Sequence, residues 1–237
     1  MPGDKTDPET VQTPRDAATV VLVRRDGPSP RVLMGQRGSK AAFMPSKFVF
    51  PGGALDPADR SAAAAFPPPA PLAERLGAGR EGATDTALGA ALALTAVREL
   101  WEETGLVHAE AGTASGALAE PWTDFASRHG RPSFAGFGFI FRAITPPGRT
   151  RRFDARFLTL DAGALDCDLD DFSGADQELS HLHWLTIGEA RGLDLPFITE
   201  VVLGELEARL TMGPDAAAVR PAPFFHHDGG RSHLDPL

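Results

Sequence analysis

A short acidic motif near the middle of the chain constrains its fold and chemistry more than any other feature. Residues 98 to 106 read Arg-Glu-Leu-Trp-Glu-Glu-Thr-Gly-Leu. Glu99, Glu102 and Glu103 fall at spacings that share one face of an α-helix. Carboxylates placed in this way repel one another by roughly 0.2–0.5 kcal/mol per pair unless a cation neutralises them. An oxygen-only ligand set suits Mg²⁺ or Mn²⁺, and Mg²⁺ commonly links protein carboxylates to substrate phosphates.

The flanking residues predict a helix over residues 86 to 104. Thr84 or Asp85 can cap its start, and Gly105 can end it in a left-handed turn. We expect one apolar face to be packed against the protein and the acidic face to border a cleft. The apolar side chains that lie roughly opposite the glutamates are Leu94, Val97, Leu100 and Trp101. An isolated acidic helix is more often a solvated surface, so the rest of the sequence must decide between the two interpretations.

Predicted strands and helices follow one another without regular alternation, which indicates an α+β fold. Apolar, β-branched or alternating segments predict strands over residues 17–24, 31–36, 47–50, 134–145, 155–160 and 179–185. Further helices are predicted over residues 187–192 and 199–210. Phe137, Phe139 and Phe141 occupy alternate positions, so we expect them to share one face of the sheet.

The acidic motif and an upstream glycine turn together resemble the signature of the Nudix hydrolases. That signature reads G-x5-E-x7-R-E-U-x-E-E-x-G-U, where U is an aliphatic residue. Gly53 matches its first glycine and follows the apolar run Phe48-Val49-Phe50-Pro51. Residues 98 to 106 match its second half completely. The resemblance implies a Nudix-type α/β/α sandwich, in which a mixed β-sheet lies between helices.

The first half of the motif departs from the family pattern. Arg98 follows Gly53 by 45 residues where the signature requires 14, so about 31 residues are inserted. Counted back from Arg98, the first glutamate of the signature falls on Ala90, and Glu81 and Asp85 are nearby acidic residues that can replace it. Residues 57 to 83 are rich in Ala, Pro and Gly, and three consecutive prolines exclude a helix where they stand. We expect an inserted loop that is either a tolerated surface excursion or a lid.

An interrupted motif is similar to that of the coenzyme A diphosphatase-like branch of the Nudix family. Local patterns over residues 43–56, 152–157 and 183–190 extend the resemblance to roughly residues 16–228. It implies a metal-dependent pyrophosphohydrolase that cleaves the diphosphate bond of a nucleoside diphosphate linked to another moiety. Coenzyme A or acyl-CoA is the leading substrate, and ADP-ribose, dinucleotides and nucleoside triphosphates are the alternatives.

The resemblance also implies roles for individual residues. Glu99, Glu102 and Glu103 are the expected ligands of Mg²⁺ or Mn²⁺, and Arg98 orients them. Gly53 allows the backbone to approach closely at the strand-to-loop turn beside the substrate. The general base is either Glu103 or Glu178, which precedes the predicted strand over residues 179–185.

Three arginines outside the motif are candidates for binding substrate phosphate. They are Arg37, at the end of the second predicted strand, and Arg152 and Arg156, in a later basic segment. For each of them the alternative is a structural or surface salt bridge.

Composition supports a single cytoplasmic enzyme domain over residues 16–237, preceded by a polar, disordered lead-in over residues 1–15. The net charge of −9 argues against a nucleic-acid partner, and one cysteine excludes an internal disulfide. No apolar run reaches the roughly 18 residues of a membrane span. The expected partner is a small nucleotide-type substrate, with a homodimer as a prior from the family.

Two other functional classes compete with the hydrolase hypothesis. One is a Nudix-fold ligand sensor without catalysis, although the chain keeps the Glu102–Glu103 pair that catalysis requires. The other is a structural domain in which the acidic helix is incidental. Binding of Mg²⁺ or Mn²⁺ at a defined stoichiometry would separate the hydrolase from that structural domain.

Overall fold

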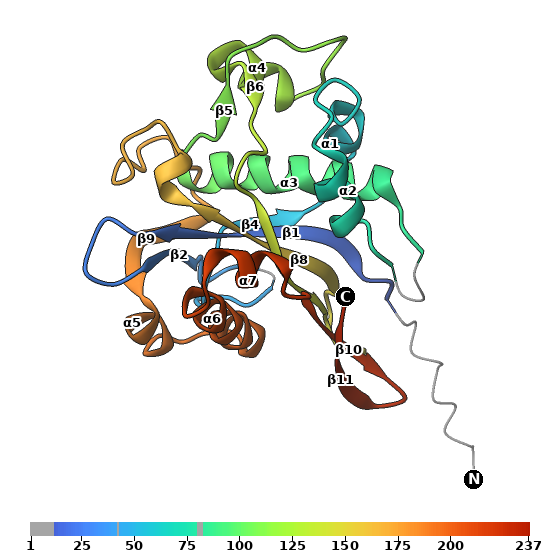
Figure 1. The fold of residues 1–237 in the computed structure, drawn as a ribbon, viewed down its shortest axis with the longest axis vertical. Coiled ribbons are helices and arrows are strands. Elements are labelled where there is room, and N and C mark those ends of the chain that lie inside the picture. The colour runs from blue at the N-terminus through green and yellow to red at the C-terminus, as the bar shows by residue number, and fades with distance from the viewer. Residues whose placement is uncertain (1–11, 42, 80–82) are drawn as a thin grey trace.

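The computed structural model describes residues 12–41, 43–79 and 83–237, and in this part of the chain a mixed β-sheet lies between helices (Figure 1). Helix α3 (Thr86–Thr104) covers one face of the sheet, and α5 (Ile187–Arg191) and α6 (Phe197–Leu210) cover the other. The α+β sandwich expected from the sequence is therefore confirmed. Most of the expected lead-in, residues 1–11, lies outside the described residues. None of the described helices is both long and apolar enough to cross a membrane.

The main sheet of the described residues has nine strands, in the order β11-β10-β7-β8-β1-β2-β3, with β4 paired to β1 and β9 paired to β2. The β1–β8 and β10–β7 pairs are parallel, and the other pairs are antiparallel. The strands are β1 (Arg15–Arg24), β2 (Arg31–Arg37), β3 (Phe48–Val49), β4 (Gly52–Ala54), β7 (Gly138–Ile144), β8 (Phe153–Asp161), β9 (Leu179–Thr186), β10 (Pro223–Asp228) and β11 (Arg231–Pro236). The β8 strand leads into a short 3-10 turn, η2 (Ala162–Ala164).

Helix α3 begins and ends where its capping residues predict. Asp85 is the N-cap, and its side chain accepts a hydrogen bond from the backbone N–H of Leu88 at 2.9 Å. Gly105 ends the helix with a φ of 75°, in the left-handed conformation that glycine adopts at least cost. Because Asp85 is used as this cap, it does not take the place of the first glutamate of the signature. Glu81 lies outside the described residues.

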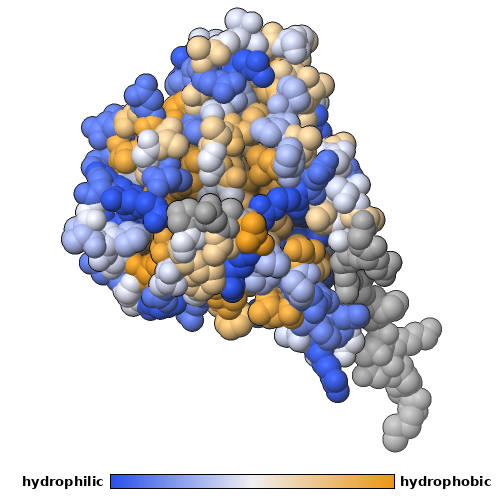
Figure 2. Space-filling model, in the orientation of Figure 1, coloured by the Kyte–Doolittle hydropathy of each residue, from blue (hydrophilic) through white to orange (hydrophobic). Residues whose placement is uncertain are grey.

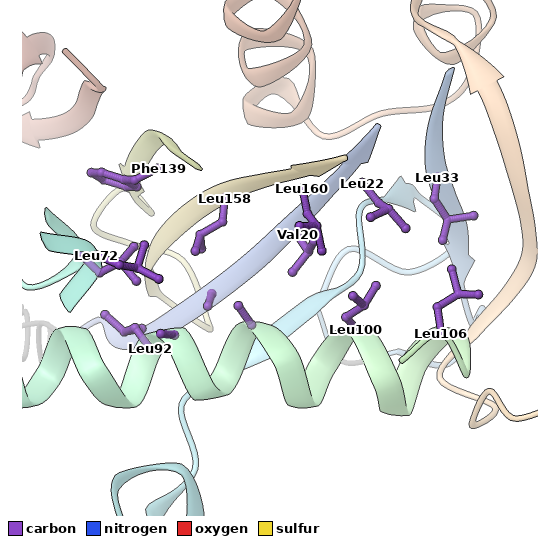
Figure 3. Packing of buried hydrophobic residues seen from close by; sticks show 14 of the residues in the cluster. Val20, Leu22, Leu33, Leu72, Leu92, Leu100, Leu106, Phe139, Leu158 and Leu160 are labelled. Atoms are coloured by element: carbon purple, nitrogen blue, oxygen red, sulfur yellow. The ribbon is translucent and has the colours of Figure 1, made fainter. Parts of the chain in front are cut away.

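The α3 helix is packed on two sides, whereas the sequence predicted one packed face. Leu92 and Leu100 point toward Val20, Leu158 and other apolar residues of the sheet (Figure 3). On the opposite side, a second set of α3 side chains belongs to a separate apolar cluster with the outer helices: Leu94, Val97 and, at its edge, Trp101. The expected single apolar face is therefore wrong, because an outer layer of helices covers what would otherwise be the solvent side of α3.

The helices of that outer layer, and α2 (Ala70–Leu76) beside them, lie in segments where no helix was predicted. Helices α1 (Pro57–Ala62) and α2 lie in the insertion, and α4 (Trp122–His129) follows α3 together with the short pair β5 (Ala109–Glu110) and β6 (Arg131–Pro132). The inserted segment is thus not the simple loop that was expected. Pro67, Pro68 and Pro69 are indeed non-helical, but they separate two helices instead of preventing them.

The phenylalanines of β7 do not share one face. Phe139 packs into the cluster beneath α3, and Phe141 packs into the cluster beneath α5 and α6. A register irregularity between these two residues explains the difference, because one extra residue in a strand reverses the side-chain alternation.

The C-terminal part of the chain adds α7 (Pro214–Val219) and the antiparallel hairpin of β10 and β11. In Figure 1 this hairpin extends away from the body of the sandwich. Polar and apolar residues are interspersed on the face shown in Figure 2.

Candidate active site

The candidate site lies where the acidic face of α3 meets the glycine turn at β4. The backbone N–H of Gly52 donates a hydrogen bond to Glu103 Oε2 at 2.7 Å. A side chain at position 53 would displace the Glu99 carboxylate, because a Cβ atom there would lie 2.4 Å from Glu99 Oε1. Gly53 therefore lets the backbone of the sheet approach the helix carboxylates directly.

Arg98 holds two of the three glutamates. Its Nη1 donates to Glu99 Oε1 and to Glu102 Oε2, each at 2.8 Å. Its Nη2 donates to the carbonyl of Ala54 at 3.0 Å, which ties the guanidinium to β4. Burial by itself lowers the pKa of Arg98, but hydrogen bonds and attraction from the surrounding carboxylates outweigh it, so the pKa is raised. Arg98 therefore stays charged and contacts two carboxylates of the acidic face, and its role in orienting them stays a prediction.

Asp59 is a further partner of Arg98, and it is the site residue that sequence reasoning missed. It is fully buried on α1 and accepts hydrogen bonds from Arg98 Nε at 2.9 Å and Nη2 at 3.0 Å. Thr95 Oγ1 and Trp122 Nε1 also donate to its carboxylate, at 2.9 and 3.0 Å. These four donors hold the Asp59 carboxylate in place at a position from which water is excluded.

A sequence signal for Asp59 existed. Counted forward from Gly53, the spacing G-x5-E falls on Asp59, so the insertion begins after this acidic residue. Counting back from Arg98 placed the acid at Ala90 instead. The segment Asp56-Pro57-Ala58-Asp59 is also a helix start, with Asp56 as N-cap, Pro57 in the first turn and Asp59 completing a capping box.

The pKa values of all three glutamates are raised, with burial as the first cause in each case. Burial raises the pKa of Glu99 to about 7, against the opposing attraction of Arg98. Burial also raises the pKa of Glu102. The pKa of Glu103 lies well above its ordinary value because of burial and, second, repulsion from Glu99. Each shift reports negative charge held near other negative charge with little solvent, which a cation would relieve.

The hydrogen-bond partners of the carboxylate oxygens of Glu99, Glu102 and Glu103 show whether a metal ion fits this site. In the described ranges, no group of three or more His, Cys, Asp or Glu side chains is arranged to hold a metal ion. Glu99 and Glu102 instead contact Arg98, and Glu103 contacts the backbone of Gly52. Glu103 Oε1, however, is buried and has no hydrogen-bond partner. A buried carboxylate oxygen without a partner, with the Glu99 carboxylate nearby, fits a hard cation such as Mg²⁺ or Mn²⁺.

The loop that precedes β9 brings Glu178 to the same region. The backbone N–H of Asp176 donates to the carbonyl of Glu102 at 2.7 Å, which anchors this loop to the end of α3. Glu178 lies close enough to raise the pKa values of Glu99 and Glu103 electrostatically. Arg37, at the end of β2, donates from Nη2 to Glu178 Oε1 at 2.7 Å. Arg37 and Glu178 are therefore both placed at the acidic cluster.

The other two arginines have internal partners. Arg156 is 2% exposed and pairs with Asp16 at 2.8 Å and Asp154 at 3.2 Å. Arg152 is also buried, and its guanidinium donates to the carbonyls of Thr145 and Gln12. The structure thus places both residues in structural contacts and leaves neither guanidinium exposed for a substrate phosphate. Sequence position alone could not reveal this burial.

Comparison with known proteins agrees with this architecture. No protein-family model matches the chain. Over 103 residues, 44% of the chain, it is 33% identical to a putative nudix hydrolase 7 from Caenorhabditis elegans, and it spans 25% of that relative's length. A NUDIX hydrolase structure from Alicyclobacillus acidocaldarius is 28% identical, with a TM-score of 0.60 over 83% of this chain and 92% of that one. The chain therefore has the Nudix fold.

Proposed function

We propose that this protein is a divalent-metal-dependent hydrolase that cleaves the diphosphate bond of a nucleoside diphosphate linked to a second moiety. The observation that carries the proposal is the buried, unpaired Oε1 of Glu103 beside two carboxylates held by Arg98. A fold does not by itself define an activity, so the argument rests on this cluster and its charge.

Glu99, Glu102 and Glu103 would hold Mg²⁺ or Mn²⁺. A bound ion at this position supplies neutralisation of the diphosphate charge and acidification of water. Arg98 orients Glu99 and Glu102 through its two 2.8 Å contacts, and Asp59 fixes Arg98 in turn. Glu99 and Glu102 contact Arg98 in this structure. To bind the ion, their carboxylates must therefore either contact Arg98 and the ion together or replace the Arg98 contact with the ion.

Glu178 is the better candidate for the general base. Glu103 is 2% exposed and hydrogen-bonded to Gly52, which suits a ligand held in one position. Glu178 has a half-exposed side chain on the loop before β9, where it can reach water. Its partner Arg37 carries the positive charge that a substrate phosphate needs, so the Arg37–Glu178 pair would open to admit substrate.

Coenzyme A or acyl-CoA is the substrate that we propose, on the resemblance of the interrupted motif. The test is hydrolysis of coenzyme A, acetyl-CoA, NADH, ADP-ribose, diadenosine polyphosphates and nucleoside triphosphates with Mg²⁺ or Mn²⁺, with products identified by mass. Release of 3′,5′-ADP and a phosphopantetheine would support the coenzyme A assignment. Turnover confined to another compound would keep the hydrolase class and reject coenzyme A.

Glu102→Gln should lower kcat by about 10²-fold or more, because the amide withdraws a charged metal ligand. Circular dichroism and thermal unfolding should remain close to those of the wild type, since the Glu102 side chain is 30% exposed. Isothermal titration with Mn²⁺ provides the second readout and should show weaker binding. Full activity of this variant with Mg²⁺ would refute the ligand assignment.

A further inference from the structure

The segment between η2 and β9, residues 165–178, is irregular in structure but is fixed to the sandwich. Figure 1 shows it beside the C-terminal end of α3. Trp184 Nε1 on β9 donates to the carbonyl of Leu169 at 2.9 Å, and Arg24 on β1 pairs with Asp170 at 2.6 Å. Leu169 also packs against the apolar cluster beneath α3. A loop that is held in this way can carry a functional side chain at a defined position.

The backbone of this loop lies directly on the end of α3. The N–H of Asp176 donates to the carbonyl of Glu102 at 2.7 Å. Two residues earlier, Gly174 packs against Gly105, the residue that ends α3. A Cβ atom at Gly105 would lie 3.0 Å from the Cα of Gly174, and one at Gly174 would lie 3.3 Å from the Cα of Gly105. The position of the loop is therefore set by the helix end that carries Glu102 and Glu103.

The side chain of Asp176 holds the residue two positions further along. Its Oδ1 accepts a hydrogen bond from the backbone N–H of Glu178 at 2.9 Å. Asp and Asn commonly form turns of this kind. Asp176 therefore links the carbonyl of Glu102 on α3 to the backbone of Glu178. Because Asp176 is exposed, its carboxylate is not part of the apolar core.

This link matters because Glu178 has little else to hold it. Among the described residues, Arg37 is the only ion-pair partner of its side chain. In the proposed function, Arg37 moves to a substrate phosphate, and Glu178 then loses that partner. The hydrogen bond between Asp176 and the N–H of Glu178 does not involve Arg37. The backbone of Glu178 can therefore stay in place while its side chain contacts water.

We propose that Asp176 is a positioning residue for the general-base candidate Glu178, whose backbone it fixes relative to the carboxylates of α3. The catalytic effect of Asp176 rests on the proposed function, whereas the hydrogen bonds that it makes do not. Asp176 has a second possible role, because the pKa of Glu102 is raised by burial and, to a smaller extent, by the charge of Asp176. Asparagine separates the two roles, since it keeps the Oδ1 acceptor but has no charge.

Kinetics of the full-length protein with Mn²⁺ test the catalytic effect, with coenzyme A or another compound that the hydrolysis panel identifies. Asp176→Ala should lower kcat by about 10–100-fold with KM close to that of the wild type, because a displaced base slows the reaction without weakening binding. Asp176→Asn should retain most of the wild-type kcat. Asp176→Ala combined with Glu178→Gln should be no slower than Glu178→Gln alone, because the two residues act as one unit.

Nuclear magnetic resonance of the metal-free, ¹⁵N-labelled protein provides a readout that does not depend on turnover. The backbone order parameter of Glu178 should fall in Asp176→Ala and stay at the wild-type value in Asp176→Asn. Mn²⁺ affinity, measured by isothermal titration, should remain near that of the wild type in both variants. Asp171→Ala is the matched control, because it removes the same kind of contact from the same loop, the 2.9 Å hydrogen bond from the N–H of Ser173. It should leave both kcat and the order parameter of Glu178 unchanged.

Three results would overturn the proposal. An equal loss of kcat in Asp176→Ala and Asp176→Asn would favour electrostatic action on Glu102. A Glu178 amide that stays ordered in Asp176→Ala would show that Asp176 does not hold it. A double variant slower than Glu178→Gln would show that Asp176 acts on another group. If no compound is hydrolysed, the proposed function fails, and the order parameters alone decide whether Asp176 positions Glu178.

Discussion

At the scale of single residues, the site depends on a carboxylate, that of Asp59, which contacts none of the three expected metal ligands. Asp59 is fully buried, and two N–H groups of Arg98 bind it side by side. Arg98 in turn contacts Glu99 and Glu102. Without the Asp59 charge, the buried guanidinium of Arg98 would lose part of the negative charge that balances it. Its contacts with Glu99 and Glu102 would then be free to change.

Asp59→Asn should therefore weaken Mn²⁺ binding and kcat by about 10–100-fold, the usual effect of changing a residue that orients metal ligands. It should also lower the free energy of unfolding by up to about 3–5 kcal/mol, because a buried ion pair loses one charge. Trp122→Phe is the matched control, since it removes one hydrogen bond to Asp59 but leaves Arg98 paired. Equal metal affinity in wild type and Asp59→Asn would contradict the positioning role.

The raised pKa of Glu99 predicts how metal-free stability depends on pH. In the folded protein this pKa is about 7, and its ordinary value is 4.5. Between these values the folded state holds a proton that the unfolded state releases, so the free energy of unfolding falls as pH rises through this window. The full effect is on the order of 3 kcal/mol.

Chemical denaturation between pH 5 and 7.5 in EDTA measures this dependence. Glu99→Gln removes the titrating group and should give a flatter profile than the wild type. Saturating Mg²⁺ should restore wild-type stability most at the upper end of the range, where the carboxylates are ionised. Parallel profiles for the two proteins would show that Glu99 does not titrate in this window.

Sequence reasoning at this scale predicted the contacts that follow from spacing along a helix. The positions of Glu99, Glu102 and Glu103 on one helix face follow from their separation, and the contact of Arg98 with two of them follows from its adjacency. The burial of Arg152 and Arg156 could not be predicted in the same way. It depends on Gln12, Asp16 and Asp154, which only the tertiary fold brings to them.

At the scale of elements, α3 shows how close two helices can approach when glycine permits it. A Cβ atom at Gly89 would lie 1.8 Å from the carbonyl oxygen of Ala73 on α2. A side chain at this position would therefore push α2 away from α3. Gly204, within α6, has no comparable neighbour, because the nearest atom to a Cβ at that position would be an Arg191 side-chain nitrogen at 3.8 Å.

Gly89→Ala should lower the free energy of unfolding by about 1–3 kcal/mol, the range for overpacking, despite the higher helix propensity of alanine. Gly204→Ala should raise it by up to about 1 kcal/mol, since only the propensity term changes. Urea denaturation of both variants measures the difference. If Gly89→Ala instead raised the free energy of unfolding, α2 would have to move away from α3 without loss of stability.

Elements with strong local signals were predicted, and those that depend on neighbours were not. The predicted boundaries of α3 agree with the structure because Asp85 and Gly105 are local caps. The strands β1, β2, β8 and β9 were also predicted to within two residues at each end. Helices α1 and α2 are only 6 and 7 residues long and gain their stability from packing on α3. Their alanine-rich and proline-rich sequences therefore resembled a loop.

At the scale of the whole molecule, the insertion is part of the core. Phe66 is fully buried in the cluster between α1, α3 and α4, and Leu76 is buried in the main cluster beneath α3. The two expectations for this segment were a tolerated surface loop and a lid. Both expectations treat the segment as detachable from the core. Its packing disagrees with that, because removal of the segment would expose both apolar clusters.

Phe66→Ala should accordingly lower the free energy of unfolding by about 3–5 kcal/mol, with Phe66→Leu intermediate because it keeps more of the buried volume. Excision of residues 62–82 should abolish the cooperative unfolding transition. Calorimetry of the three proteins is the measurement. A cooperatively folded excision variant with an altered KM would instead favour the lid.

The Asp59–Arg98 pair has a consequence for how the length of this chain can vary. Its partners are 39 residues apart in sequence, whereas the family signature sets the corresponding residues eight apart. The entropy of closing a loop grows only with the logarithm of its length, so this lengthening adds on the order of 1.5 kcal/mol. One bidentate ion pair can offset that amount. The ion pair thus joins the two ends of the inserted segment. A segment of almost any length can be accommodated between Asp59 and Arg98, provided that it returns the chain to Arg98.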